Sequence, residues 1–197
     1  TKIVLSISAV FILFGTLAFL VFEWDNQQTI GSMGVGDKLL NSFFQSVTTR
    51  TAGFNTIDLE SMRGITKGLM IFLMFVGAAP GSTGGGIKVS RIAIAVKTVN
   101  KELSSLIHPR NVKVLKYEGK PIEHNVLRSI NTYLVAYILI FTVSLLLISL
   151  DNFDMTTNFT AVAATLNNIG PGLSKVGPTC NFGIFNPFNK YILMFDM

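Results

Sequence analysis

Two turns in this chain share one plan and could line a path for a cation. The first reads TTRTAGFN over 48–55, and the second reads TLNNIGPG over 165–172. When Gly53 is aligned with Gly170, Thr48 falls on Thr165. A single such turn would be no more than a helix-ending glycine. Two matching turns favour a pore loop, whose backbone carbonyls replace the water around a cation.

A third glycine-rich segment lies between the two turns. Residues 81–88 read GSTGGGIK and follow Pro80. Consecutive glycines weaken a helix and allow several backbone paths. The segment is therefore either a static kink or a mobile gate, and we favour the gate. It is not a phosphate-binding loop, because that motif needs a lysine directly after the last glycine and Ile87 intervenes here.

The elements around these segments have the composition of a membrane protein. Mean hydropathy is +0.51, and 14% of the residues are charged, compared with about 25% in ordinary soluble domains. Ile3–Phe22 and Asn131–Leu150 contain no charged residue and are long enough to cross a bilayer. Ile3–Phe22 lacks a small-residue cleavage site before Glu23, which favours a retained helix over a signal peptide.

Each turn follows a short amphipathic stretch, Lys38–Thr49 in the first case and Thr156–Leu166 in the second. A dozen helical residues extend only about 18 Å, too short to cross a bilayer. The alternative is a buried core helix, but the position between two membrane segments favours a re-entrant helix. Asp37 is expected to cap the first of them. The C-terminal ends would direct negative dipoles toward a cation.

The helix that precedes the glycine-rich segment is also expected to be incomplete. Ile65–Ala79 covers only about 22 Å, so the break at Pro80 would lie at membrane depth. The helix is expected to resume at Ile87 and to run to about Leu106. Beyond it, Val112–Tyr117 and Pro121–Glu123 are expected to form a small hairpin around a turn at Glu118. Tyr191–Met197 is apolar but short, which suggests a truncated last helix.

The basic residues indicate the topology. Residues 88–128 carry nine lysines and arginines, whereas 23–37 carries none. The positive-inside rule places 88–128 in the cytoplasm and 23–37 outside. Topology thus accounts for the net charge of +5, and no nucleic-acid partner is expected.

Other function classes find little support in the sequence. Cys180 is the single cysteine, which excludes an intrachain disulfide and a cysteine-rich metal site. His108 and His124 lack ligand spacing. A membrane-embedded enzyme would need carboxylates, histidines or cysteines at membrane depth, and the acidic residues lie at the expected interfaces. A helical anchor without transport would not explain the two matching turns.

Four motifs together resemble the Trk/Ktr/HKT superfamily of potassium transporters, and within it most closely the pore subunit of the bacterial Trk system. These motifs are TRTAGFN (49–55), GSTGGGIK (81–88), HPR (108–110) and AATLNNIGPGL (163–173). The resemblance implies an all-α membrane protein with helix–pore-loop–helix repeats of a potassium-channel-like fold. It also implies that, in the first of the two repeats present here, the second helix is broken. Residues 1–103 would be the third of four repeats, 104–124 a cytoplasmic connector and 125–197 the fourth repeat, truncated in its last helix.

The resemblance also implies the residues of the site. The potassium-binding filter would use the backbone of Thr51, Ala52, Gly53, Phe54, Asn168, Ile169, Gly170 and Pro171. The intramembrane gate would comprise Gly81, Ser82, Thr83, Gly84, Gly85, Gly86 and Lys88. Because neither turn is a full TVGYG, discrimination against sodium is expected to be weaker than in tetrameric potassium channels.

The implied function is potassium uptake across the cytoplasmic (inner) membrane, by a multi-pass protein that is not an enzyme. Potassium is the transported ion, and no cofactor is expected in this chain. The implied partners are the lipid bilayer, the other repeats of the parent chain and a second copy in a homodimer. A cytosolic ring of nucleotide-binding regulatory subunits of the TrkA type would dock on the basic face at 88–128.

Overall fold

The computed structural model describes residues 2–82, 84–108, 116–117 and 120–197. Its main elements are α1 (Lys2–Glu23), α2 (Val35–Thr48), α3 (Gly64–Phe75), α4 (Val89–Ile107), β1 (Lys116–Tyr117), β2 (Lys120–Pro121), α5 (His124–Ile148), α6 (Met155–Leu166) and α7 (Pro187–Asp196). The prediction of a helical chain is confirmed. The strands are two residues each and pair antiparallel. Lys120, which was expected in the turn, thus belongs to a strand, and so does Pro121, with which the second expected extended run begins.

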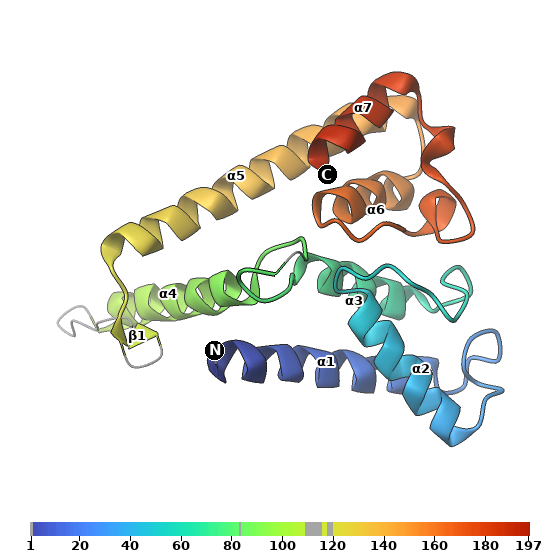
Figure 1. The fold of residues 1–197 in the computed structure, drawn as a ribbon, viewed down its shortest axis with the longest axis horizontal. Helices are drawn as coiled ribbons and strands as arrows, with labels where there is room; N and C mark the ends of the chain where they lie inside the picture. The colour runs from blue at the N-terminus through green and yellow to red at the C-terminus, as the bar shows by residue number, and fades with distance from the viewer. Residues whose placement is uncertain (1, 83, 109–115, 118–119) are drawn as a thin grey trace.

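The helices form two groups that meet along α3 and α6 (Figure 1). One group contains α1, α2 and α3, with α2 crossing α1, and the other contains α5, α6 and α7. The loops after α1, before α3 and after α6 lie at one end of the molecule, and β1 lies at the other. The predicted topology would place these two ends on opposite sides of the membrane, and that assignment stays a prediction.

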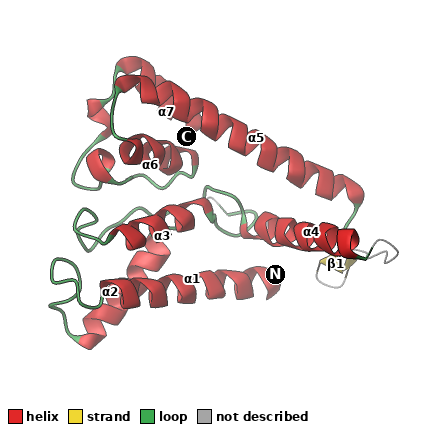
Figure 2. Cartoon of the chain, turned by 180° about the vertical axis from the view of Figure 1, so that it is seen from behind, coloured by secondary structure: helices red, strands yellow, loops and turns green. Residues whose placement is uncertain are grey.

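Among the described residues, two helices are long and apolar enough to cross a membrane, α1 and the helical stretch His124–Asp151 that contains α5. Most of their residues are not buried within the described chain, and large side chains such as Leu17 and Ile138 are exposed on them. The reverse view shows α5 extending well beyond α6 (Figure 2). These surfaces suit lipid or further protein segments better than water.

Buried apolar side chains join the two groups. Leu173 of the second group packs with Met70 and Leu73 of α3, and Met74 packs with Ala163 and Ile169. A separate cluster around Ile148, Val162 and Phe185 holds α5, α6 and the chain before α7 together. The core therefore runs through α3 and the second turn, the elements that position the site.

Three helix boundaries differ from the sequence-based expectations. The cap of α2 is Gly34, and Asp37 lies in the first turn of that helix, where its charge still favours the helix dipole. The helix α3 ends at Phe75, before the expected Ala79, and α4 begins at Val89, after the expected Ile87. A parallel bridge between Val76 and Ile87 explains both of the latter differences, because it satisfies backbone groups that helical turns would otherwise use.

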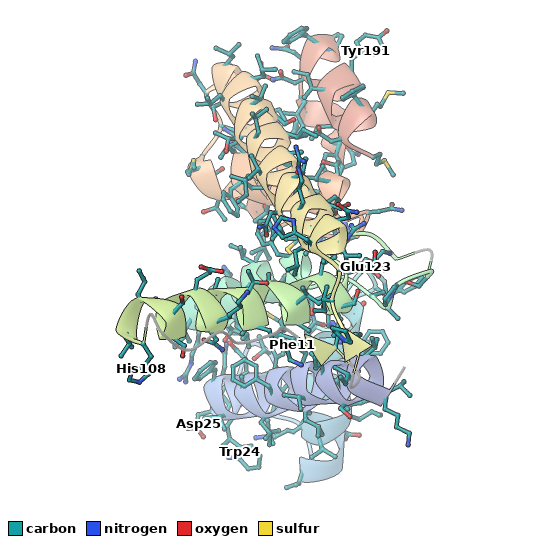
Figure 3. The ribbon with its side chains drawn as sticks, turned by 90° about the vertical axis from the view of Figure 1, so that its left-hand side faces the viewer. Phe11, Trp24, Asp25, His108, Glu123 and Tyr191 are labelled. Atoms are coloured by element: carbon teal, nitrogen blue, oxygen red, sulfur yellow. The ribbon has the colours of Figure 1, made fainter. Side chains whose placement is uncertain are left out.

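The side-chain view shows the two ends of the helices (Figure 3). Trp24 and Asp25 lie at one end of α1, His108 lies at the end of α4, and Glu123 lies beside the start of α5. The side chain of Tyr191 projects from α7 at the edge of the molecule and is 71% exposed. The predicted docking residues Arg110 and Lys113 lie outside the described residues.

Candidate cation-pathway site

The first turn begins where α2 ends. The backbone amides of Ala52 and Gly53 both donate to the carbonyl of Thr48, at 3.1 and 3.0 Å. The Thr48 hydroxyl donates to the carbonyl of Phe54 at 2.7 Å. Residues Thr51 and Gly53 have φ angles of 86° and 75°. The chain therefore folds back tightly, and the local hydrogen bonds use the carbonyls of Thr48 and Phe54.

The second turn follows α6 and repeats the positive φ angles of the first turn, although its hydrogen bonds differ. The amides of Asn168 and Ile169 donate to Thr165 and Ala164 at 2.9 and 2.8 Å. Asn168 and Gly170 have φ angles of 50° and 110°. These are the two positions that align with Thr51 and Gly53. The sequence match is thus accompanied by positive φ at both aligned positions.

The positive φ of Thr51 is more unusual than that of Gly53, because a β-branched side chain disfavours this region. Backbone strain of about 1–3 kcal/mol persists only where the surroundings impose it, and it gathers at ligand sites. Glycine at position 53 relieves the same constraint two residues later.

The two turns meet each other. A Cβ atom added at Gly53 would overlap the carbonyl oxygen of Ile169 and would lie 2.9 Å from Cδ of Pro171. A small cavity of about 20 Å³ beside them is lined by residues of both turns and by Met70 and Met74 of α3. The structure therefore brings together the predicted residues 51–54 and 168–171, which are more than 100 positions apart in the sequence.

The glycine-rich segment lies against both turns. A Cβ at Gly85 would overlap the backbone carbonyl of Asn167, and one at Gly84 would lie 3.0 Å from Oγ1 of Thr51. The amide of Gly77 donates to Ile87 at 2.9 Å, and the amide of Ile87 donates to Phe75 at 3.2 Å. These bonds hold the two ends of the segment together. Thr83, which was also predicted to belong to it, lies outside the described residues.

Lysine 88 closes this segment from its C-terminal side. Its ammonium donates to the carbonyl of Ser82 at 3.1 Å and also to that of Gly84. The carbonyls that this ammonium occupies are the kind of group that otherwise binds an alkali cation. The predicted gate residues 81, 82, 84–86 and 88 thus form one local structure.

Arg50 has a role that sequence reasoning missed. Its guanidinium donates to the carbonyls of Gly77, Val76 and Ser8, at 3.0, 3.4 and 3.4 Å, and lies 5.9 Å from the centre of the Phe11 ring. The cation therefore ties the first turn to α1 and to the end of α3. A charged residue inside an apolar region needs such partners, and that signal was present in the sequence.

Glu23 was also missed, since the sequence placed it at an exposed interface. Its carboxylate is 1% exposed and accepts from the amide of Arg63 at 3.0 Å and from Asn26 and Thr29 at 2.6 and 2.9 Å, as well as from the Thr66 hydroxyl. It joins the end of α1 to the start of α3. Within the described residues no group of three or more histidines, cysteines or carboxylates could hold a metal ion.

A larger cavity of about 450 Å³ borders the second turn on its other side. Its lining includes Thr165 and Gly170 of the turn and Leu193 and Met197 at the end of the chain. In contrast to Gly53, a Cβ at Gly170 would meet no atom within 4 Å. The two turns are therefore alike in conformation but not in surroundings.

This chain is similar in sequence to known cation transport proteins. A family model described as TrkH, cation transport protein, matches residues 1–197. The Trk system potassium uptake protein TrkH of Salmonella typhimurium is 39% identical over 160 residues, which cover 81% of this chain and 33% of that protein. The Ktr system potassium uptake protein B of Vibrio alginolyticus is 46% identical over 95 residues, covering 48% of this chain and 21% of that protein.

A solved structure gives the same picture. The crystal structure of the potassium transporter TrkH from Vibrio parahaemolyticus matches with a TM-score of 0.84 and 31% identity, over 96% of this chain and 40% of that chain. The chain spans about a third of the length of the curated TrkH relatives that it matches. These relatives are named for transport and not for catalysis.

Proposed function

Because the chain belongs to the TrkH family of cation transport proteins, we propose that its two turns form part of a carbonyl-lined filter for potassium uptake across the cytoplasmic membrane. The observation that carries the proposal is the shared backbone of the two turns. Positive φ recurs at aligned positions, 51 with 168 and 53 with 170, and the turns touch at Gly53 and Ile169. A single positive φ is common just after a helix, but its recurrence at two aligned positions in turns that touch supports a shared role.

The chemistry of the turns suits a partly dehydrated alkali cation. Residues 51–54 and 168–171 contain no charged side chain, so the ligands would be neutral carbonyl oxygens. Such rings replace hydration water without holding the ion too tightly to leave. The C-terminal ends of α2 and α6 lead directly into the turns, and their dipoles place partial negative charge there.

Two turns supply only part of a ring, and we propose that 1–103 and 125–197 are two of four similar repeats. The 450 Å³ cavity supports this proposal. Counted from the first residue of each helix, Leu193 of α7 and Met197, directly after α7, correspond to Met70 and Met74 of α3. Met70 and Met74 line the surface that receives the second turn, and Leu193 and Met197 line the cavity with Gly170. We therefore expect the turn of another repeat to pack in this cavity, as the second turn packs against α3.

The glycine-rich segment 81–86, with Lys88, would be the gate of this pathway. It contacts both turns through Gly84 and Gly85, so a change in its path alters the space below them. Non-helical backbone at membrane depth is tolerated only where protein buries it or where it lines a cavity. The two hydrogen bonds from Lys88 would hold the segment in the conformation seen here.

Partners follow from the same proposal. The full-length protein would form a homodimer and would bind a cytosolic nucleotide-binding ring of the TrkA type. The basic connector is the proposed docking surface. Reversing the charges of Arg110, Lys113 and Lys116 should weaken that binding in a salt-dependent manner, which a pull-down at two salt concentrations would measure.

Growth of a host that lacks potassium uptake tests the function. A full-length protein that contains this segment should restore growth at low potassium concentration, and residues 1–197 alone should not conduct when reconstituted in liposomes. Failure of the full-length protein to restore growth or rubidium uptake, despite its presence in the membrane, would contradict the proposal. Flux through 1–197 would contradict the four-repeat arrangement, unless two copies were shown to pair.

A further inference from the structure

A buried hydrogen bond links the long helix α5 to the second turn. The hydroxyl of Tyr137 donates to the side-chain amide oxygen of Asn167 at 2.6 Å. Tyr137 is 7% exposed and Asn167 is fully buried. A polar pair in such an apolar place is costly unless both groups are satisfied. Asn167 meets this condition by also donating its amide to Ala163 at 2.7 Å.

Asn167 is the residue on which the glycine-rich segment rests. Its backbone carbonyl fills the position that a Cβ of Gly85 would need, and its amide oxygen lies 3.1 Å from the Cβ position of Gly86. The next residue, Asn168, is the one with positive φ. A single side chain therefore contacts the proposed gate and begins the proposed filter turn.

One turn earlier on α5, Tyr133 contacts the helix that follows the gate. The guanidinium of Arg91, in the first turn of α4, lies 3.8 Å from the centre of the Tyr133 ring. The rings of Tyr133 and Tyr137 are themselves 6.1 Å apart. Through these two tyrosines, α5 contacts both the helix that follows the gate and the turn above it.

From this arrangement we infer that Tyr137 is a positioning residue for ion transport. Its hydroxyl fixes Asn167, and Asn167 sets both the second turn and the surface on which Gly85 and Gly86 lie. Tyr133 and Arg91 keep α4 in register with this contact. Tyr137 itself touches no ion. The inference rests on the proposed filter and gate. It assigns to Tyr137 the role of holding the two in a fixed position relative to each other.

The experiment compares Tyr137→Phe with Tyr133→Phe in the full-length protein. Each variant loses one hydroxyl on the same helix and keeps its ring. Of these two hydroxyls, only that of Tyr137 has a hydrogen-bond partner within the described residues. Rubidium uptake would be measured as KM and Vmax, with sodium as competitor, and normalised to the folded protein recovered by gel filtration. We expect Tyr137→Phe to change the KM or the sodium preference by roughly two- to tenfold, as the loss of one buried hydrogen bond does to an equilibrium constant. Tyr133→Phe should match the wild type.

A second variant protects the test against poor folding. Asn167→Ala removes the acceptor of the same bond and should shift KM or sodium preference in the same direction. Wild-type KM and sodium preference in both variants would overturn the inference. If Gly53→Ala abolishes uptake while Tyr137→Phe behaves as wild type, only this inference fails. If neither variant affects uptake, the proposed filter itself fails.

Discussion

The two turns have the same backbone plan but are held in different ways. In the first turn, Gly53 lies against the carbonyl of Ile169, and Arg50 binds carbonyls of Val76 and Gly77. In the second, Gly170 borders a cavity, and the hydrogen bond from Tyr137 to Asn167 holds the start of the turn. Equivalent positions in a repeated motif therefore carry different energetic roles, because each depends on the neighbour that packs against it.

The largest expected effect separates the two glycines. Gly53→Ala would force a Cβ into the Ile169 carbonyl at a positive φ, whereas Gly170→Ala would incur only the conformational strain. In the full-length protein, we expect Gly53→Ala to lose nearly all rubidium uptake and Gly170→Ala to reduce uptake or relax exclusion of sodium. Uptake and selectivity assays would measure both.

Gly68→Ala is the matched control, because Gly68 lies within α3 with no atom within 4 Å of its Cβ position. Its uptake should be that of the wild type. Equal effects of Gly53→Ala and Gly170→Ala would remove the distinction between the two turns. Wild-type behaviour in both would refute the assignment of the filter.

A smaller effect is expected in the glycine-rich segment, where the same contrast recurs. Gly85→Ala would displace the carbonyl of Asn167, whereas at Gly81, with φ of 80°, a Cβ meets nothing within 4 Å. Gly85→Ala should therefore lower the uptake rate by more than Gly81→Ala does. The rate should change more than the preference for potassium over sodium.

Paired flux and competition measurements on these two variants would distinguish a gate from a filter. A change in selectivity alone would assign the segment to the filter. Unchanged flux after deletion of 84–86 would make the segment a static kink.

The smallest expected effect concerns the helices that lead into the turns. Helix α6 is capped by Asp154, whose carboxylate accepts from the backbone amide of Thr157 at 3.0 Å and from its hydroxyl, whereas the cap of α2 is Gly34 without a side-chain bond. Asp154→Asn should lower the free energy of unfolding at neutral pH by at most about 1 kcal/mol, because asparagine also caps helices. Asp154→Ala should lower it by about 0.5–2 kcal/mol.

The pH dependence of this loss follows from the pKa of Asp154. The bond from the Thr157 side chain holds that pKa below its usual range. The carboxylate therefore stabilises the folded state above the unfolded pKa of about 3.9, and this contribution is lost as the pH falls through the lower folded value. Thermal melts in detergent should show the difference between wild type and Asp154→Ala shrinking in acid. A difference that grows on acidification would contradict the assignment.

Sequence patterns predicted the helical class, the two turns, the glycine-rich segment and the ends of the molecule on which the loops lie. Local signals sufficed for these features. Apolar stretches of membrane length predict spanning helices, and glycine at 53 and 170 predicts a backbone that other residues avoid. The basic stretch at 88–128 predicts its side of the membrane, and that assignment stays a prediction. The roles of the filter and gate residues stay predictions.

Only the tertiary structure decided which of these features touch. The contacts of Gly53 with Ile169, of Gly85 with Asn167 and of Tyr137 with Asn167 join residues 30 to more than 100 positions apart, and no local period encodes such a pairing. The early end of α3 has the same origin, since the bridge from Val76 to Ile87 forms only after the chain has folded back. Glu23 and Arg50 found their partners in this way too. Composition showed that they were charged, and packing decided that Glu23 is buried and that both side chains have hydrogen-bond partners.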